Sequence, residues 1–243
     1  MNKGKLFVVS IGPDGIDQMS VNAVEILKKC DIICGYKRYI EQLPPILFNK
    51  NTRLFSYNMG EESKRVKDAI EYTKKGNTVA LVSGGDASLY GLASLVYETI
   101  DEADLVEVVP GITAILAASA RLGSPVSEDV ILMSLSDLLI PWSTIERRIQ
   151  LYALIDVVFG IYNPKSKKRN WQLKYLVDLF YRERGDLLCG AVKNAMRKNE
   201  ETKIFTLTHI DYEFIDMSTI LIIGSSKTYL KNNKMVTPRG YTI

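Results

Sequence analysis

Short apolar segments alternate with amphipathic segments through the first half of the chain, and this alternation constrains the fold more than any other sequence feature. The apolar segments have the length of buried strands, whereas the segments between them have the periodicity of helices with one polar face. Strands are expected at 6–11, 31–36, 78–83 and 104–111, and helices at 20–29, 61–76 and 88–100. Such alternation is typical of parallel sheets covered by helices, so the first half predicts an α/β domain with a mostly parallel sheet.

The pattern changes after residues 111–129, which begin as a helix of small residues and end in a Gly/Ser/Pro stretch. We therefore expect two α/β domains, residues 1–115 and residues 116–243. In the second, strands are expected at 130–136, 156–163, 186–195, 203–208 and 218–224, with long helices only near 143–153 and 169–184. Strands that follow one another without helices favour antiparallel pairing, so the second domain predicts a mixed sheet.

Composition excludes several classes of protein. Hydrophobic residues make up 47% of the chain and charged residues 24%, as in globular proteins. No apolar run reaches the roughly 18 residues of a membrane span, and the run 6–11 is too short for a signal peptide. The net charge of +3 is too small to argue for a nucleic-acid partner. The expectation is a cytoplasmic protein that binds neither membrane nor nucleic acid.

The three cysteines form neither a disulfide framework nor a paired metal-binding motif. Cys30 and Cys34 are expected to be small hydrophobic residues in or beside a buried strand. His209 is the only histidine and is interpreted as structural. No metal site is expected.

Three glycine-bearing turns follow predicted strands, at 10–15, 83–91 and 109–114. None has the Gly-Lys-Ser/Thr of a P-loop or the GxGxxG of a dinucleotide site, so a phosphate ligand is disfavoured. In an open parallel sheet, turns at the carboxyl ends of strands surround one crevice. Asp86 could face a cationic or hydroxylated group there, which favours a nucleoside without phosphate, such as S-adenosylmethionine. Turns that are glycine-rich only for tight geometry are the alternative.

The same turns resemble the motifs of a known family. "GPDGIDQMS", "SGGDASLYG" and "VPGITAI" are similar to the Gly-Pro loop, the Gly-Asp-Pro loop and the Pro-Gly-Ile/Val-Thr/Ser-Ala motif of the tetrapyrrole methylases. The resemblance runs essentially from end to end. "GYKRYIEQL", "SLSDLLIPWSTIERRI" and "YNPKSKKR" resemble the precorrin-3 C17-methyltransferase branch. Ser10 and Asp14 stand where the family usually has glycine, and Ala87 stands where it usually has proline.

The resemblance implies two α/β domains with a cleft between them, a homodimer, and S-adenosylmethionine as cofactor. It implies methylation of C17, with ring contraction, in cobalamin biosynthesis. The acceptor would be cobalt-precorrin-3 or the metal-free precorrin-3B, and the cobalt form is preferred. Three alternatives stay open: another carbon of a precorrin or uroporphyrinogen ring, methylation of RNA or a translation factor, and a non-catalytic nucleoside-binding module.

The resemblance also implies roles for individual residues. The donor would be held by Pro13, Gly84, Gly85, Asp86, Leu89, Thr113, Ala114, Tyr162, Asn163 and Ala191. The carboxylates of the tetrapyrrole would pair with basic residues drawn from Lys37, Arg38, Arg147, Arg148, Lys165, Lys168 and Arg169, about half of which could instead lie on solvated faces. Proton transfer during ring contraction would fall to Asp137, Ser134 or Ser136. Asp137 could equally be an N-terminal helix residue that binds backbone N–H groups.

Overall fold

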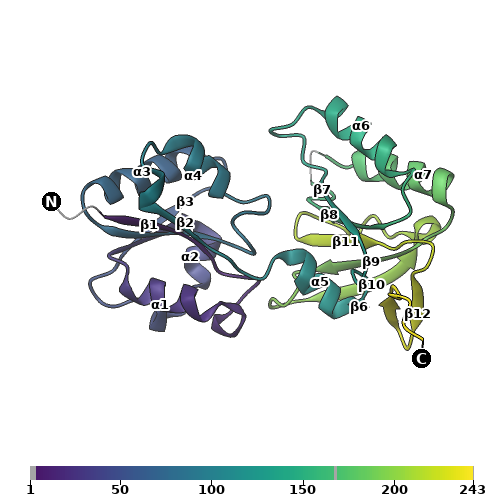
Figure 1. The fold of residues 1–243 in the computed structure, drawn as a ribbon, viewed down its shortest axis with the longest axis horizontal. Helices are drawn as coiled ribbons and strands as arrows, with labels where there is room; N and C mark the ends of the chain where they lie inside the picture. Colours follow the sequence, from purple (N-terminus) through teal and green to yellow (C-terminus); the bar gives the residue numbers. More distant parts are fainter. Residues whose placement is uncertain (1–3, 167–168, 243) are drawn as a thin grey trace. The chain divides into compact units, whose positions relative to one another are not determined.

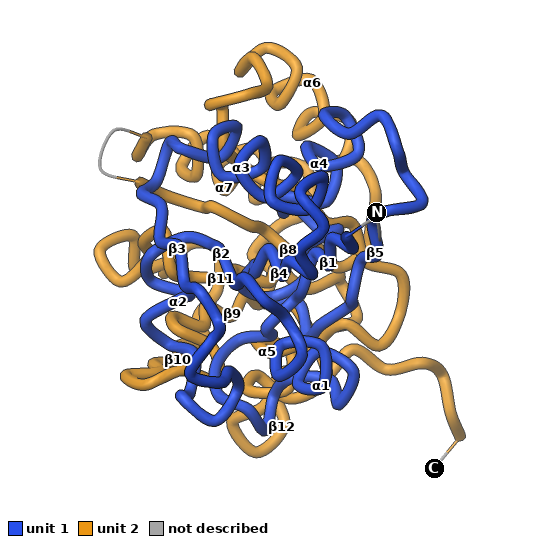
Figure 2. Tube along the Cα trace, turned by 90° about the vertical axis from the view of Figure 1, so that its left-hand side faces the viewer, with its two compact units in different colours: residues 1–114 blue, residues 115–243 orange. Residues whose placement is uncertain are grey.

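The computed structural model describes residues 4–166 and 169–242 of the 243-residue chain. The chain divides into two compact units, residues 1–114 and residues 115–243 (Figure 2). The boundary expected from the sequence lies one residue further along the chain. Each unit has its own sheet and its own apolar core, so each is described by itself.

Unit 1 is built on a five-stranded sheet in the order β3–β2–β4–β1–β5. The strands are β1 (Lys5–Ser10), β2 (Ile32–Tyr36), β3 (Arg53–Tyr57), β4 (Thr78–Ser83) and β5 (Val106–Val109). Every neighbouring pair among these described strands is parallel, which confirms the prediction of a mostly parallel sheet. The sequence did not predict β3, an edge strand in which only Tyr57 is buried.

Helices cover both faces of this sheet (Figure 1). The described helices of unit 1 are α1 (Val21–Lys29), α2 (Lys37–Gln42), α3 (Glu62–Lys74) and α4 (Ala93–Thr99), with short 3-10 turns η1 (Ile16–Gln18), η2 (Pro45–Leu47) and η3 (Ala103–Leu105). One apolar cluster joins α3 and α4 to the sheet, and a second joins α1 and α2 to the opposite face. Ser20 caps α1 as predicted, since its hydroxyl accepts a hydrogen bond of 3.1 Å from the N–H of Ala23.

Unit 2 contains a mixed five-stranded sheet in the order β10–β9–β11–β8–β7, as predicted. The strands are β7 (Val130–Ser134), β8 (Val158–Tyr162), β9 (Leu188–Lys193), β10 (Glu201–Thr206) and β11 (Thr219–Ile223). The β7–β8 pair is parallel and the other pairs are antiparallel. A small second sheet, absent from the prediction, contains β6 (Gly123–Ser124), β12 (Tyr229–Lys231) and β13 (Lys234–Val236).

The helices of unit 2 lie on opposite faces of its large sheet (Figure 1). They are α5 (Ala114–Leu122), α6 (Trp142–Tyr152) and α7 (Gln172–Arg184), with a short 3-10 turn η4 (Leu207–His209). On the α6–α7 face, Phe159 packs edge to face against Phe180 with ring centroids 4.7 Å apart. On the α5 face, a Cβ at Gly160 would lie 2.5 Å from Cδ1 of Ile115, so the glycine lets the helix approach the strand closely.

The cysteines are free and buried, which confirms the interpretation of Cys30 and Cys34 as small hydrophobic residues. Burial raises the pKa of each of these two thiols to about 12.

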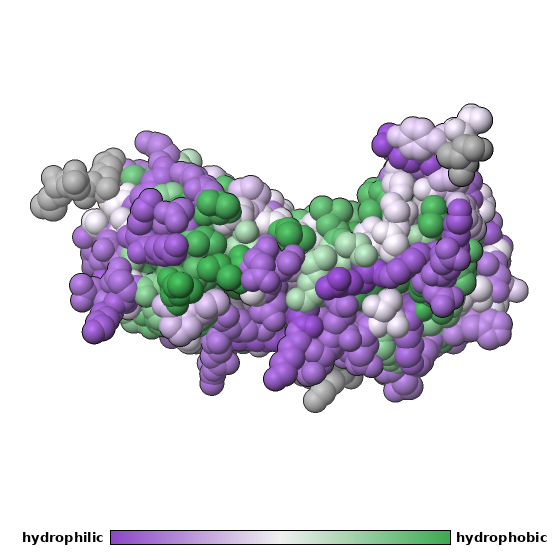
Figure 3. All heavy atoms as spheres, turned by 90° about the horizontal axis from the view of Figure 1, so that it is seen from below, coloured by the Kyte–Doolittle hydropathy of each residue, from purple (hydrophilic) through white to green (hydrophobic). Residues whose placement is uncertain are grey.

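Hydrophilic side chains cover most of the face shown in Figure 3, with smaller apolar areas between them. Within residues 4–166 and 169–242, no helix is long and apolar enough to cross a membrane.

Candidate functional site

The three glycine turns meet at one edge of the unit 1 sheet. They follow β1, β4 and β5, which are neighbours in the order β4–β1–β5 and run parallel, so their carboxyl ends share an edge. The first two turns are paired directly: the Gly12 N–H donates to the Gly85 carbonyl at 3.1 Å, and the Gly85 N–H donates to the Gly12 carbonyl at 2.8 Å. Both glycines have φ near +66°, a conformation that other residues adopt at a cost. The first two turns are therefore fixed to each other by a reciprocal pair of backbone hydrogen bonds.

Asp86 joins the second turn to the third. Its Oδ2 accepts a hydrogen bond of 2.9 Å from the Gly111 N–H, and its Oδ1 accepts hydrogen bonds from the N–H and hydroxyl of Ser88. Burial alone would raise the pKa of Asp86, but the bonds from Ser88, Gly111 and Leu89 outweigh it and hold the pKa below its ordinary value. The carboxylate thus accepts from the chain's own donors, which gives it a role in ordering the turns.

Two departures from the family pattern are bonded to each other. The N–H of Ala87, which a proline would lack, donates to the hydroxyl of Ser10 at 2.9 Å, and a glycine would lack that hydroxyl. Both residues are fully buried. The bond closes the second turn over the end of β1, so the loop keeps a defined anchor without the proline.

The other expected donor-binding residues of unit 1 lie at or beside these turns. Pro13 follows Gly12, Gly84 precedes Gly85, and Leu89 lies within the second turn. Thr113 and Ala114 end the third turn, where α5 begins.

Two tyrosines mark the second turn. A Cβ at Gly84 would lie 2.7 Å from the ring of Tyr39, which packs over the second turn. The sequence had not singled out Tyr90, which has an unusual φ of +54° and marks a strained point of the second turn.

Lys37 and Arg38 lie near the same edge. α2 begins at Lys37 directly after β2, which is a neighbour of β4 in the sheet. Both side chains are exposed, and Lys37 forms a weak ion pair of 3.8 Å with Glu41 one turn along α2. The two cations are therefore available at the rim of the unit 1 turns.

Unit 2 brings a second group of expected residues together where β7 and β8 end. Ser134, the last residue of β7, is in register with Tyr162, the last residue of β8. The amide Nδ2 of Asn163 donates to the Ser134 hydroxyl at 3.0 Å, and the Ser136 N–H donates to the same hydroxyl at 3.2 Å. Asn163 adopts φ of +49°. Two loops that are far apart in sequence are thus joined through one hydroxyl group.

Asp137 contacts two side chains from the region where the loop after β8 leads into α7. Its Oδ2 accepts a hydrogen bond of 3.2 Å from Nε2 of Gln172, and its Oδ1 lies 3.6 Å from Nε of the buried Arg169. Burial lowers the pKa of the Arg169 guanidinium, and the Asp137 charge opposes that effect. Arg169 also donates to the Asn163 carbonyl at 2.6 Å. The residue before α6 is Pro141, so Asp137 is not a cap of that helix and the capping alternative is wrong.

Several expected residues of unit 2 have other surroundings. The Tyr162 hydroxyl accepts from the N–H of Ile115 at 3.1 Å, at the start of α5. Ala191 is fully buried in β9, with its side chain in the unit 2 core. Lys165 donates to the Tyr212 carbonyl at 2.7 Å. Arg147 and Arg148 are exposed on α6, and Lys168 lies outside the described residues.

The sequence analysis did not anticipate Asn194, which lies at the edge of the unit 2 sheet where β8 and β9 end. Asn194 directly follows β9, which runs in the same direction as β8 because both are antiparallel to β11. It has φ of +50°, and its Oδ1 is buried without a hydrogen-bond partner among the residues that the structure describes. Met196 and Asn199 in the same loop are also left-handed. The asparagines of "KNAMRKNE" indicate only a turn, so the sequence did not reveal this strain.

Comparison with known proteins gives a consistent result. Residues 5–211 match the family described as Tetrapyrrole (Corrin/Porphyrin) Methylases. The chain is 39% identical over 242 residues to a probable cobalt-factor III C(17)-methyltransferase of Salmonella typhimurium, covering 98% of this chain and 100% of that protein. It is 41% identical to the cobalamin biosynthesis protein CbiHC of Archaeoglobus fulgidus, but covers only 54% of that longer protein.

Among solved structures, the crystal structure of the methyltransferase CobJ superimposes with a TM-score of 0.89 at 27% identity, covering 97% of this chain and 100% of that one. The family match, the 39% identity over nearly the whole of both chains and the superposition all point to the same family. The chain belongs to the tetrapyrrole (corrin/porphyrin) methylase family.

Proposed function

We propose that this protein is the C17-methyltransferase of cobalamin biosynthesis, acting on a cobalt-containing tetrapyrrole that already carries three methyl groups, with contraction of the ring. The observation that carries this proposal is the 39% identity, over the full length of both proteins, to a relative named for that reaction on cobalt-factor III. This resemblance also favours the cobalt form over the metal-free precorrin-3B.

The unit 1 turns suit the donor. Residues 10–15, 83–91 and 109–114 contain no lysine or arginine, so they offer nothing to neutralise a phosphate. S-adenosylmethionine has no phosphate, and its adenine, ribose and methionine groups can be read by backbone N–H and C=O groups. When bound, it supplies an electrophilic methyl group on a positively charged sulfur. Pro13, Gly84, Gly85, Leu89, Thr113 and Ala114 are the proposed donor-binding residues of unit 1.

Catalysis of methyl transfer would come mainly from alignment and from exclusion of water. The acceptor carbon displaces the thioether in line, and the transferred methyl group needs no covalent help from the protein. The Gly12–Gly85 pair and the Asp86–Gly111 bond hold the turns in fixed positions before any ligand arrives. Rigid turns of this kind place the donor without a loop-ordering cost.

Ring contraction needs protons to move, and Asp137 is the proposed group. Its carboxylate is 38% exposed, so it can reach a ligand while Gln172 and Arg169 hold its orientation. The Ser134 hydroxyl accepts from both Asn163 and Ser136, so its own proton is free to be donated. Ser134 is therefore the second candidate, and Ser136 the third.

The carboxylates of the acceptor would pair with exposed cations. Lys37, Arg38 and Arg148 are the proposed partners among the exposed candidates, and Arg147 is left out because helical geometry points it directly away from the unit 2 core. Lys165 and Arg169 are engaged with unit 2 itself, through Tyr212 and Asn163 respectively, so we assign them to structure. The protein is further proposed to act in the cytoplasm. We also propose that it is a homodimer, and light scattering of the purified protein would test its molar mass.

The test is an anaerobic incubation with the cobalt-containing trimethylated substrate and S-adenosylmethionine labelled with carbon-13 in its methyl group. We expect one label per product by mass spectrometry, located on C17 by NMR, and carbon–carbon connectivities in the NMR spectrum that fit the contracted ring. A label on another carbon would contradict the proposal and point to a different methylase of the same family. Calorimetry with S-adenosylhomocysteine, and with ATP as a phosphate-bearing control, would test the donor site separately.

A further inference from the structure

The loop between β7 and α6 exposes three consecutive apolar side chains. Leu138 is 85% exposed, Leu139 is 91% exposed and Ile140 is 39% exposed. Isolated exposed leucines are common on proteins, but a continuous run at the surface indicates a binding surface. We call residues 138–140 the apolar loop.

The apolar loop is held at both ends. At its start, Asp137 is bonded to Gln172 and lies beside Arg169. At its end, Trp142 packs edge to face against Trp171 and Tyr175, with ring centroids 4.7 and 5.6 Å away. The exposed leucines therefore belong to a loop with a defined position, directly after the site residues Ser134 and Ser136.

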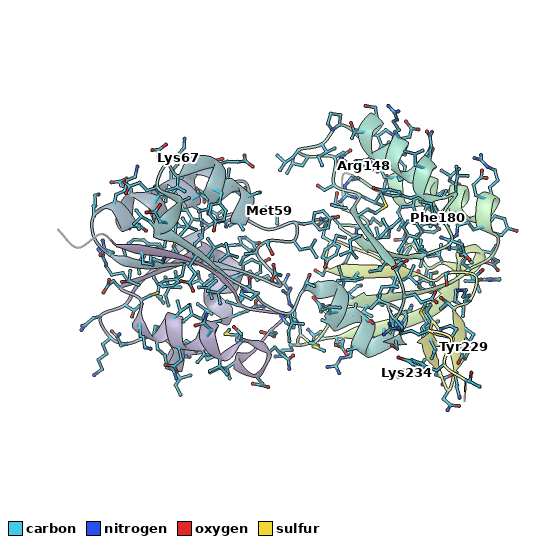
Figure 4. The ribbon with its side chains drawn as sticks, viewed as in Figure 1. Met59, Lys67, Arg148, Phe180, Tyr229 and Lys234 are labelled. Atoms are coloured by element: carbon cyan, nitrogen blue, oxygen red, sulfur yellow. The ribbon has the colours of Figure 1, made fainter. Side chains whose placement is uncertain are left out.

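Arg148 lies on one flank of the helix that follows. Ile145 and Ile149 of α6 point into the unit 2 core, and Gln150 on one flank donates to the hydroxyl of Tyr175 in α7. By helical geometry Arg148 occupies the opposite flank, away from α7, while Arg147 points directly away from the core. Within the described part of the chain neither arginine forms an ion pair, and Figure 4 labels Arg148 beside α6.

We propose that the apolar loop is a contact surface for one face of the tetrapyrrole, and that Arg148 of α6, the helix that follows the loop, binds a carboxylate at the rim of the ring. This inference rests on the proposed function. A tetrapyrrole is a broad apolar ring with acidic side chains at its edge, so it complements adjacent leucines and an unpaired arginine. Leu138 and Leu139 would position the acceptor and take no part in the chemistry.

A second copy of the chain is the competing occupant, and the structure favours it less. Three side chains offer far less area than the roughly 800 Å² per partner that a stable dimer buries. The loop is also continuous with Ser134, Ser136 and Asp137, which belong to the proposed chemical site. Both observations favour a small planar ligand.

The test compares the double variant Leu138→Ser/Leu139→Ser with Leu154→Ser. Leu154 is 70% exposed just beyond the other end of α6, so it controls for loss of an exposed leucine. The probe is uroporphyrin, a stable porphyrin with eight carboxylates, and its binding is followed by fluorescence. We expect the double variant to bind it about tenfold more weakly or worse, since one lost leucine contact is of that order. Leu154→Ser should bind as the wild type does.

Three results would overturn the inference: equal porphyrin affinity in the double variant and the wild type, an equal loss in Leu154→Ser, or no porphyrin binding by the wild type. A double variant that changes the oligomeric mass in light scattering would instead assign the loop to a second copy. Calorimetry with S-adenosylhomocysteine and thermal unfolding should be unchanged, which separates acceptor contact from misfolding. Methylation of a carbon other than C17 by the wild type would refute the proposed function and leave this inference standing.

Discussion

At the scale of single residues, Ser10 and Ala87 show how a family motif can change without losing its loop. The Ala87 N–H donates a hydrogen bond to the Ser10 hydroxyl. The residues usual in the family could not form this bond, since glycine has no hydroxyl and proline has no N–H. Because both are fully buried, either change alone would leave a polar group without a partner. The two departures therefore act as a pair.

A double-mutant cycle tests this pairing. Ser10→Gly alone should lower the free energy of unfolding by about 1–3 kcal/mol, because the Ala87 N–H loses its acceptor in a buried site. In the double variant Ser10→Gly/Ala87→Pro that N–H no longer exists, so the combined loss should be smaller than the sum of the two single losses. Urea denaturation gives all four values, and additive losses would show that the two positions are independent.

Asp86→Asn should also destabilise unit 1, because an amide offers one acceptor oxygen where the carboxylate offers two. We expect a loss of about 1–3 kcal/mol at pH 7, as for other hydrogen bonds to charged groups. The folded-state pKa of Asp86 is lowered, so its contribution is complete above the unfolded pKa and disappears as the pH falls through the folded value. The stability gap between wild type and variant should therefore shrink on acidification below about pH 4. A gap that stays constant with pH would mean that the charge is not involved.

At the scale of elements, the sequence predicts those that are buried and misses those that are exposed. Runs such as 78–83 and 218–224 predicted β4 and β11 closely because both strands are buried along their length. β3 was missed because an edge strand with four partly or fully exposed residues has no apolar run. The β12–β13 hairpin was missed too, although Asn232 and Asn233, both left-handed, form the kind of turn that asparagine pairs favour.

The candidate site was predicted to a similar extent. Sequence motifs located the three glycine turns and the "SLSD" and "YNP" loops, because these residues are local to strand ends. They could not reveal that Asp86 bonds to Gly111 or that Asn163 bonds to Ser134, since those contacts depend on which strands become neighbours. They could not show that Lys165 turns toward Tyr212 either, because the sequence does not record the direction of a side chain.

The two arginines of α6 allow a matched test of acceptor binding. Arg148→Glu should raise the KM for the tetrapyrrole several-fold to about tenfold, because a cation on the helix that follows the apolar loop becomes an anion that repels carboxylates. Arg147→Glu changes the net charge equally on the outward side of the same helix, so its effect should be much smaller. Affinity for S-adenosylhomocysteine should stay the same in both. Equal effects of the two variants would assign the change to the overall field of the protein.

Asp137→Asn separates the two halves of the proposed reaction. The amide keeps an acceptor for Gln172 but loses the charge and the basicity, so methyl transfer can continue while proton transfer fails. We expect a methylated product by mass spectrometry that NMR shows to be uncontracted, or a stall before methylation if the two steps are concerted. Donor binding should be normal in calorimetry. A normal yield of contracted product would exclude Asp137 and direct attention to Ser134.

At the scale of the whole molecule, the chain consists of two units with separate cores and different sheets. The parallel sheet of unit 1 places three turns at one edge, and the β7–β8 pair of unit 2 places two loops at one edge. Both clusters are fixed by hydrogen bonds within their own unit. Each half of the proposed machinery is therefore preorganised by its own fold.

The buried cysteines make the opening of each unit measurable. Cys30 and Cys34 lie in unit 1 and Cys189 lies in unit 2, and burial raises the pKa of all three thiols, so almost no thiolate is present near neutral pH. A thiol reagent should therefore leave the native protein unmodified and report only molecules in which a unit has opened. Peptide mapping after timed labelling would give one opening rate for residues 30 and 34 together and another for residue 189. Rapid labelling of any of the three under native conditions would contradict the burial seen here. The natural cysteines therefore report the opening rate of each unit separately, with no engineered label required.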